Sequence, residues 1–223
     1  MRSSTPLAAL VAALLLGTLF VAPVAAVQSD PTTLPEESEV GTEFEATFEL
    51  TELFGEFNEW TLSAGTELEN STWTIRQYNQ AGDELSRVDA DGQSVSQPID
   101  LDEGTATVEI RVTGTTPEVE EWSYDPPDSL VAANFTQERD GGTADEIASH
   151  EGHHYTTESK HAREAIDQAQ ATVGDSGDAR SSLDSAISAY ESGNFENAIS
   201  LAERAEDEAS QSQLIRNALI GVG

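Results

Sequence analysis

The spacing of the apolar residues changes once along the chain, near Thr157. Before this point apolar and polar residues alternate, which is the period of β-strands that bury one face. After it, apolar residues recur every three or four positions, which is the period of amphipathic helices. A chain that keeps these two periods in separate parts is predicted to fold as α+β, with a sheet unit followed by a helical unit.

The alternation is clearest in residues 42–50, where phenylalanine, alanine and leucine alternate with glutamate and threonine. Turn residues separate this segment from further alternating ones. These are 60–64, 71–79, 95–101 and 106–112. Clean alternation is typical of antiparallel sheets with one wet face. Roughly six or seven short strands predict an immunoglobulin-like β-sandwich, to which we assign residues 42–125.

The aromatic residues of this region are predicted to form its core. They are Phe44, Phe48, Phe54, Phe57, Trp60 and Trp73. Residues 27–41 are predicted to be a flexible N-terminal segment. Residues 126–156 contain two prolines and a Gly-Gly pair, so we predict a connector there. Trp122 and Tyr124, just before it, are expected to pack back on the sandwich.

Residues 157–223 are predicted to form three antiparallel helices joined by short loops. Thr157, Asp178 and Asn194 are the expected N-terminal caps, and Gly193 is the expected left-handed end of the second helix. The inward faces are rich in alanine, which allows the helices to approach each other closely.

One helical hairpin resembles a known repeat. Tyr190, the Gly-Asn-Phe turn at 193–195 and the spaced alanines at 198, 202 and 205 resemble the helix-turn-helix of a tetratricopeptide repeat. The pattern occurs once, whereas stable arrays contain at least about three repeats. The resemblance therefore implies a TPR-like hairpin rather than a groove-type peptide receptor.

The charge of the chain indicates the environment in which it folds. Its 42 acidic residues face nine arginines and one lysine, Lys160, and the net charge is −32. Self-repulsion of this size destabilises a compact fold in dilute buffer, whereas at 1 M salt the Debye length is only about 3 Å. This acidic surface is typical of a halophilic protein. It also argues against nucleic acid as a partner, because phosphates need a basic surface.

Residues 1–26 have the features of a secretory signal peptide. Arg2 precedes an apolar run over 7–22, and Val24 and Ala26 stand at the usual −3 and −1 positions for cleavage. Cleavage is favoured over an uncleaved N-terminal anchor. The chain contains no cysteine, so neither disulfides nor a cysteine-linked lipid anchor is expected. We therefore predict an exported protein at the extracellular face of the cell envelope.

The last ten residues, 214–223, turn apolar after a strongly acidic segment. Ten residues are too few to span a bilayer, which takes about 20. Two interpretations stay open. The segment is either the frayed, half-buried end of a helix, or the first turns of a membrane anchor whose remainder is not present in this chain.

A wider resemblance covers nearly all of the mature chain. Gly-Thr-Thr-Pro at 114–117, Tyr-Asp-Pro-Pro at 124–127 and His-Tyr-Thr at 154–156, leading into residues 162–166, resemble a family of uncharacterised exported haloarchaeal proteins. Such relatives often carry a membrane helix after the helical unit. The resemblance implies a location rather than an activity, and it carries over no functional residues.

All four histidines lie within residues 150–161. His150, His153 and His154 are the candidate metal ligands, because imidazoles at short spacing beside carboxylates can hold zinc or another divalent metal. The pattern differs from the His-Glu-x-x-His signature of zinc proteases. The competing interpretation is a polar hinge before the first helix. We expect no other cofactor.

Asn70 and Asn134 begin the two glycosylation sequons, and Asn134 is the better candidate because it falls in the predicted connector. The sequence contains no nucleophile elbow and no phosphate-binding loop. We therefore predict a non-enzymatic, membrane-associated envelope protein that acts as an interaction or structural module with an envelope or membrane protein partner. The alternative is a metal-binding envelope protein that uses the hinge between His150 and His161.

Overall fold

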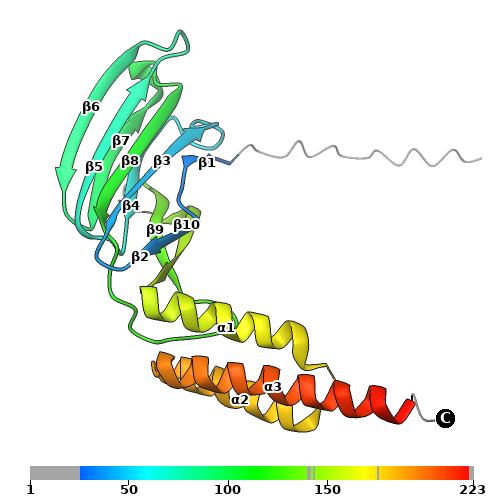
Figure 1. The fold of residues 1–223 in the computed structure, drawn as a ribbon. Coiled ribbons are helices and arrows are strands. Elements are labelled where there is room, and N and C mark those ends of the chain that lie inside the picture. Colours follow the sequence, from blue (N-terminus) through cyan, green and yellow to red (C-terminus); the bar gives the residue numbers. More distant parts are fainter. Residues whose placement is uncertain (1–25, 140–141, 143, 175, 221–223) are drawn as a thin grey trace, which may run out of the picture.

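The computed structural model describes residues 26–139, 142, 144–174 and 176–220. Within these residues the chain forms ten strands in two five-stranded sheets, followed by three helices (Figure 1). The fold is therefore α+β, as the change of period predicts. The predicted signal peptide, residues 1–26, lies almost entirely outside the described residues.

The two sheets are built mainly from antiparallel pairs. The first sheet has the order β1 (Gln28–Thr33), β3 (Glu43–Thr51), β8 (Thr107–Thr115), β5 (Glu69–Tyr78) and β6 (Glu84–Asp91). The second has the order β2 (Glu37–Glu39), β10 (Asp145–Tyr155), β9 (Ser129–Glu138), β4 (Glu59–Gly65) and β7 (Ser94–Asp100). The short β2 lies parallel to β10. A single 3-10 turn, Leu101–Glu103, follows β7.

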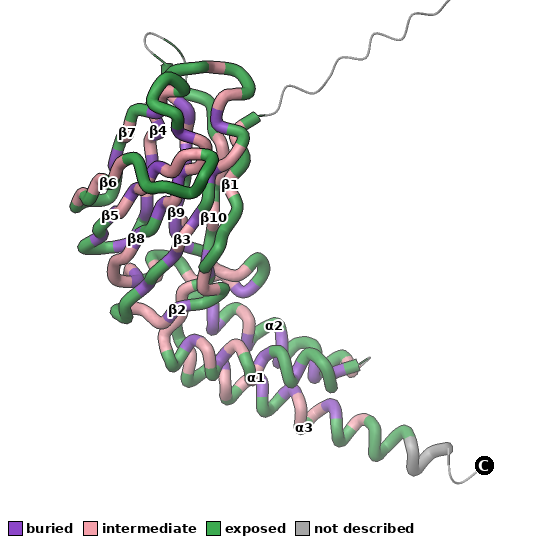
Figure 2. Tube along the Cα trace, turned by 90° about the horizontal axis from the view of Figure 1, so that it is seen from above, coloured by how far each residue is buried: buried purple, intermediate pink, exposed green. Residues whose placement is uncertain are grey.

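The core of this β domain (residues 28–155) lies between the sheets, and both sheets contribute to it. Phe48 of β3 and Phe135 of β9 meet edge to face, with ring centroids 5.2 Å apart. Figure 2 shows how buried and exposed positions alternate along the strands. Four of the predicted core aromatics are buried, namely Phe44, Phe48, Trp60 and Trp73. Phe54 and Phe57 pack only partly buried at its margin.

The prediction of a connector over residues 126–156 was wrong, because β9 and β10 occupy most of it. Both strands lie inside the second sheet, so the β domain extends well beyond the predicted end at residue 125. The predicted flexible segment, 27–41, likewise contains β1 and β2. Register shifts at two places in β10 interrupt the alternation of its side chains, which explains why a period-two pattern is not visible there.

Three helices form the predicted helical unit: α1 (Thr157–Val173), α2 (Gly177–Glu191) and α3 (Phe195–Ile220). Thr156, rather than Thr157, caps α1. Its Oγ1 accepts a hydrogen bond from Ser159 N at 3.1 Å, and Ser159 Oγ accepts one from Thr156 N at 3.0 Å. At the start of α2 the cap is Ser176, not the predicted Asp178.

The turn between α2 and α3 agrees with the prediction. Gly193 has a φ of +72°, in the left-handed region, and Asn194 Oδ1 accepts from Asn197 N at 3.3 Å. The alanines at the helix contacts are fully buried, which allows the helices to pack closely. They are Ala162, Ala169, Ala179, Ala186, Ala198, Ala202 and Ala205. None of the described helices is long and apolar enough to cross a membrane.

The loop between β8 and β9, residues 116–128, descends to the helices before the chain returns to the second sheet (Figure 1). We call this loop the strap. Its Trp122 ring contacts Tyr190 and Phe195 edge to face, with centroids 6.1 Å and 4.8 Å away. The expectation that Trp122 and Tyr124 pack on the sandwich was therefore wrong. Most of the buried residues of the helical core are alanines, and the strap adds the rings of Trp122 and Tyr124 to it.

Tyr124 is the strap side chain most deeply buried against the helices, with 8% of its surface exposed. Its hydroxyl donates to Asp167 of α1, and the Arg163 guanidinium lies 4.8 Å from its ring centroid. Arg163 also donates to the Tyr124 carbonyl oxygen at 2.8 Å. Burial, followed by the bond to Asp167, raises the pKa of Tyr124, so that the hydroxyl stays a donor. The strap thereby ties the helical unit to the β domain.

Candidate functional site

His150, the first of the predicted metal ligands, closes one edge of the β domain. It lies on β10 of the second sheet, and its ring stacks on Phe48 with centroids 4.6 Å apart. Its Nε2 lies 2.8 Å from Ser29 Oγ on β1, which belongs to the first sheet. Burial lowers the pKa of His150, and the charge of Asp30 on β1 partly opposes this. His150 is therefore a half-buried residue that joins the two sheets.

Acid should weaken the fold through His150. Because its pKa in the folded chain lies below the unfolded value of about 6.5, the unfolded chain binds the proton first. The stabilisation is complete above the unfolded pKa and is lost as pH falls through the folded pKa. At constant high salt, the thermal midpoint should drop between about pH 7.5 and about pH 5. The drop should shrink in His150→Gln and persist in His161→Gln, whose histidine is exposed. Equal drops in both variants would contradict this role.

His153 and His154 have partners different from that of His150. His153 Nδ1 lies 3.0 Å from the Asp128 carbonyl oxygen, and His154 Nδ1 lies 3.3 Å from the Pro117 carbonyl oxygen. Both carbonyls belong to the strap or its end. The segment is a strand, in which neighbouring side chains point to opposite faces. Among the described residues, no group of three or more histidine or carboxylate side chains is arranged to hold a metal ion.

The two sequons lie in different surroundings. Asn134 lies in the middle of β9, opposite Gly65 of β4, and not in a connector. Its Oδ1 lies so close to Gly65 that a Cβ added there would approach it to 2.4 Å. Asn70 is exposed at the start of β5 with a φ of +50°, where the register with β8 shifts. Both asparagines are exposed, and glycosylation of either residue stays a prediction.

The outward face of the first sheet carries charges in ordered pairs. Arg76 Nη1 on β5 donates to Glu109 Oε1 on β8 at 2.6 Å, and this bond raises the pKa of Arg76. Arg111 on β8 pairs with Glu45 on β3. Exposed pairs contribute at most about 1 kcal/mol each to stability. Their main consequence here is a face whose side chains have defined positions.

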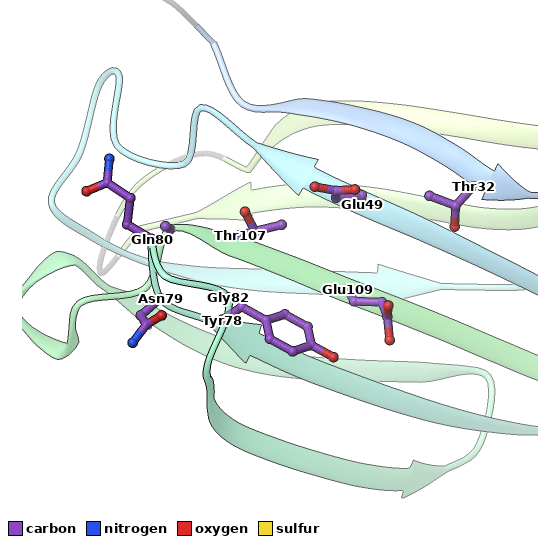
Figure 3. A pocket seen from close by; sticks show the side chains of 9 residues that line it. Thr32, Glu49, Tyr78, Asn79, Gln80, Gly82, Thr107 and Glu109 are labelled. Atoms are coloured by element: carbon purple, nitrogen blue, oxygen red, sulfur yellow. The ribbon is translucent and has the colours of Figure 1, made fainter.

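A hollow of about 400 Å³ lies on this outer face, beside the hairpin between β5 and β6 (Figure 3). We call it the outer-face hollow. Its lining combines an aromatic ring, carboxylates, an amide and hydroxyls drawn from β1, β3, β5, β8 and the hairpin. Its lining includes the side chains of Thr32, Glu49, Tyr78, Gln80, Thr107 and Glu109.

The hairpin beside the hollow is held by Asn79. Its Oδ1 accepts from the backbone nitrogens of Ala81 and Asp83, each at 2.9 Å. Gly82 takes a φ of +86°, which the turn requires and which side chains disfavour. The hairpin is therefore fixed by its own bonds, and Gln80 at its tip stays exposed over the hollow.

Glu49 differs from the paired charges around it, because its carboxylate has no basic partner within the described residues. Its register partners are Glu109 on one side and Asp30 on the other, so three acidic residues lie side by side across β8, β3 and β1. Arg76 pairs with Glu109, but the Glu49 carboxylate has no hydrogen bond or ion pair within the described part of the chain. It is thus a free acceptor at the edge of the hollow.

Sequence reasoning missed this hollow, although one signal was present. Trp73, Ile75 and Gln77 are the inward residues of β5, so Tyr78 falls on the outward register. An aromatic residue on the solvent-facing side of a strand in so acidic a protein indicates a candidate binding surface. The positions of Glu49 and Thr32 near Tyr78 depend on the order of the strands in the sheet, which the sequence pattern does not show.

Comparisons with known proteins place the chain in no family. No protein-family model matches it, and no curated protein sequence matches it. Among solved structures, it is similar to the sporulation control protein Spo0M from Bacillus subtilis, with 13% identity and a TM-score of 0.34. That match covers 65% of this chain and 56% of the other.

Two further structural neighbours are equally distant. A DUF4466 family protein from Parabacteroides merdae is 15% identical with a TM-score of 0.33, and the match covers 58% of this chain and 46% of that one. A cohesin module from a family 33 glycoside hydrolase of Clostridium perfringens is 14% identical with a TM-score of 0.27, covering 58% and 97%. The chain thus spans about half the length of the first two neighbours. Similarity at this level supports no inference about activity.

Proposed function

We propose that this chain is a non-enzymatic, exported protein of a halophile's cell envelope, which acts as an interaction module through the outer face of its first sheet. The observation that carries this proposal is the outer-face hollow, set among ordered charge pairs on a broad sheet face. The two-layer β domain fits an immunoglobulin-like sandwich, a common scaffold for surface recognition. The net charge of −32 and the signal-like N-terminus support the halophilic and exported setting.

The end of α3 supports a membrane-proximal position for the helical unit. Leu214 and Ile215 are 70% and 63% exposed. Glu208 is the last acidic residue of the sequence, and Arg216 is the only charged side chain after it. An apolar helix end with a basic residue fits the anionic headgroup region of a membrane better than it fits water. The β domain, at the other end of the molecule, would then face outward.

Cross-linking from defined positions tests the interaction. The natural chain has no cysteine, so a photo-reactive group can be attached at one introduced site. Gln80→Cys carries it at the hollow, and Ser96→Cys carries it on the exposed face of the second sheet. In intact cells at their native salt, Gln80→Cys should yield one dominant adduct with an envelope component, and Ser96→Cys should not. The same adducts from both positions, or none from either, would contradict the proposal.

A further inference from the structure

The outer-face hollow has the chemistry that recognises a sugar ring. Tyr78 presents an aromatic ring that extends along the sheet toward Glu109 (Figure 3). Glu49 offers a free carboxylate and Thr107 offers a hydroxyl. Thr32 Oγ1 donates to the Thr47 carbonyl oxygen at 3.0 Å and can still accept a hydrogen bond. We infer that the hollow binds a neutral carbohydrate, such as a hexose unit of an envelope glycan. This inference rests on the proposed interaction module and names the ligand of the same face.

The size and rigidity of the hollow suit such a ligand. Its volume of about 400 Å³ falls within the roughly 300–1,000 Å³ that is typical of small-molecule sites. It is open on one side, so a glycan chain can continue beyond the bound unit. Asn79 fixes the hairpin before any ligand arrives, which lowers the entropic cost of binding.

Charge favours a neutral ligand over an anion. Glu49 has two acidic register neighbours and no basic partner in the described part of the chain, so an anionic group beside it is repelled. At molar salt the Debye length is about 3 Å, which removes long-range attraction for ions of either sign. Short-range hydrogen bonds to hydroxyl groups and packing of C–H groups on an aromatic ring keep their strength under these conditions.

A cation is a weaker fit than a sugar. Of the two carboxylates that line the hollow, Glu109 already accepts from Arg76 at 2.6 Å. The positive guanidinium therefore lies next to the position that a cation would take. Tyr78 would also have no part in holding a hard cation such as calcium, which takes oxygen ligands from carboxylates and carbonyls.

The test measures binding of free saccharides to the purified protein in about 3 M KCl. Saturation-transfer NMR detects the binding. The probes are neutral hexose disaccharides and trisaccharides, their glucuronic acid counterparts, and calcium chloride alone. We expect binding of at least one neutral probe. Tyr78→Ala should weaken it roughly fivefold or more, and Glu49→Gln should weaken it by a smaller factor. Tyr78→Phe keeps the ring and should retain most of the affinity. Leu85→Ala, on β6 outside the lining, is the matched control.

Three outcomes would overturn the inference. One is that no neutral probe binds while the Gln80→Cys variant still cross-links in cells. This result would support the interaction module and contradict a sugar as its ligand. Another is tighter binding of the glucuronic acid probes than of the neutral ones. The last is calcium binding that Glu49→Gln abolishes and Tyr78→Ala leaves intact. In contrast, a Gln80→Cys variant that gives no cross-link in cells would contradict the proposed interaction module itself.

Discussion

Transfer from about 3 M to about 0.1 M KCl should abolish the cooperative fold, and return to high salt should restore it. The physical reason is the net charge of −32. At 0.1 M salt the Debye length grows to about 10 Å, so neighbouring acidic residues repel one another across the whole surface. Ten basic residues cannot pair 42 acidic ones. A salt titration followed by circular dichroism, with a thermal melt at each step, measures the effect.

A charge-reduced variant separates repulsion from the general strengthening of apolar packing by salt. Glu191, Glu196 and Glu203 are exposed on α2 and α3. Changing all three to glutamine leaves the packing intact and removes three negative charges. The salt concentration at the midpoint of folding should then fall. A natural chain that melts cooperatively at the same temperature in both salts would contradict the halophilic interpretation.

Tyr124→Ala should make the helical unit unfold at a lower temperature than the β domain. The substitution removes the ring that packs on Tyr190 and interacts with Arg163, and it leaves Asp167 without its donor. Loss of a large buried aromatic costs about 3–5 kcal/mol. A helical unit whose other core residues are mostly alanine has little to offset that loss. Far-UV circular dichroism at high salt should show a separate, earlier loss of helix.

Tyr124→Phe is the matched control, because it keeps the ring and deletes only the hydroxyl. It should cost about 1.5–3 kcal/mol, the range for a hydrogen bond to a charged group. The two variants together distinguish ring packing from the bond to Asp167. If Tyr124→Ala unfolds in a single transition at the melting temperature of the natural chain, the strap does not stabilise the helices.

Sequence patterns predicted the elements whose surroundings are simple. Residues 43–51 alternate cleanly because one face of β3 lies in the core and the other in water. Gly193 and Asn194 mark the turn between α2 and α3 through local backbone requirements. In both places the local rule and the tertiary structure agree, so the sequence alone is sufficient.

The failures come from tertiary context. In β9, Ala132 and Ala133 are adjacent and both buried, which hides the alternation. Register shifts in β10 do the same. The prediction for Trp122 and Tyr124 was wrong, because a local sequence pattern does not show which of two cores a side chain packs on.

The prediction of the candidate site also failed because of tertiary context. The histidines cluster in the sequence, but a strand directs His153 and His154 to opposite faces and stacks the half-buried His150 on Phe48. The outer-face hollow instead joins Thr32, Glu49 and Tyr78 from three different strands. Such a site depends on the sheet order and on the register of β1, β3, β8 and β5. Neither is contained in a local pattern.

Labelling of intact cells tests most directly whether this chain works outside the membrane. A Ser96→Cys variant carries the only cysteine of the chain, at an exposed position away from the hollow. It should be produced in a halophilic archaeal host and treated with a membrane-impermeant maleimide at full salt, beside a cytoplasmic protein with an exposed cysteine. We predict that intact and lysed cells label this variant equally, while the cytoplasmic control labels only after lysis. Labelling of Ser96→Cys only after lysis would contradict the account.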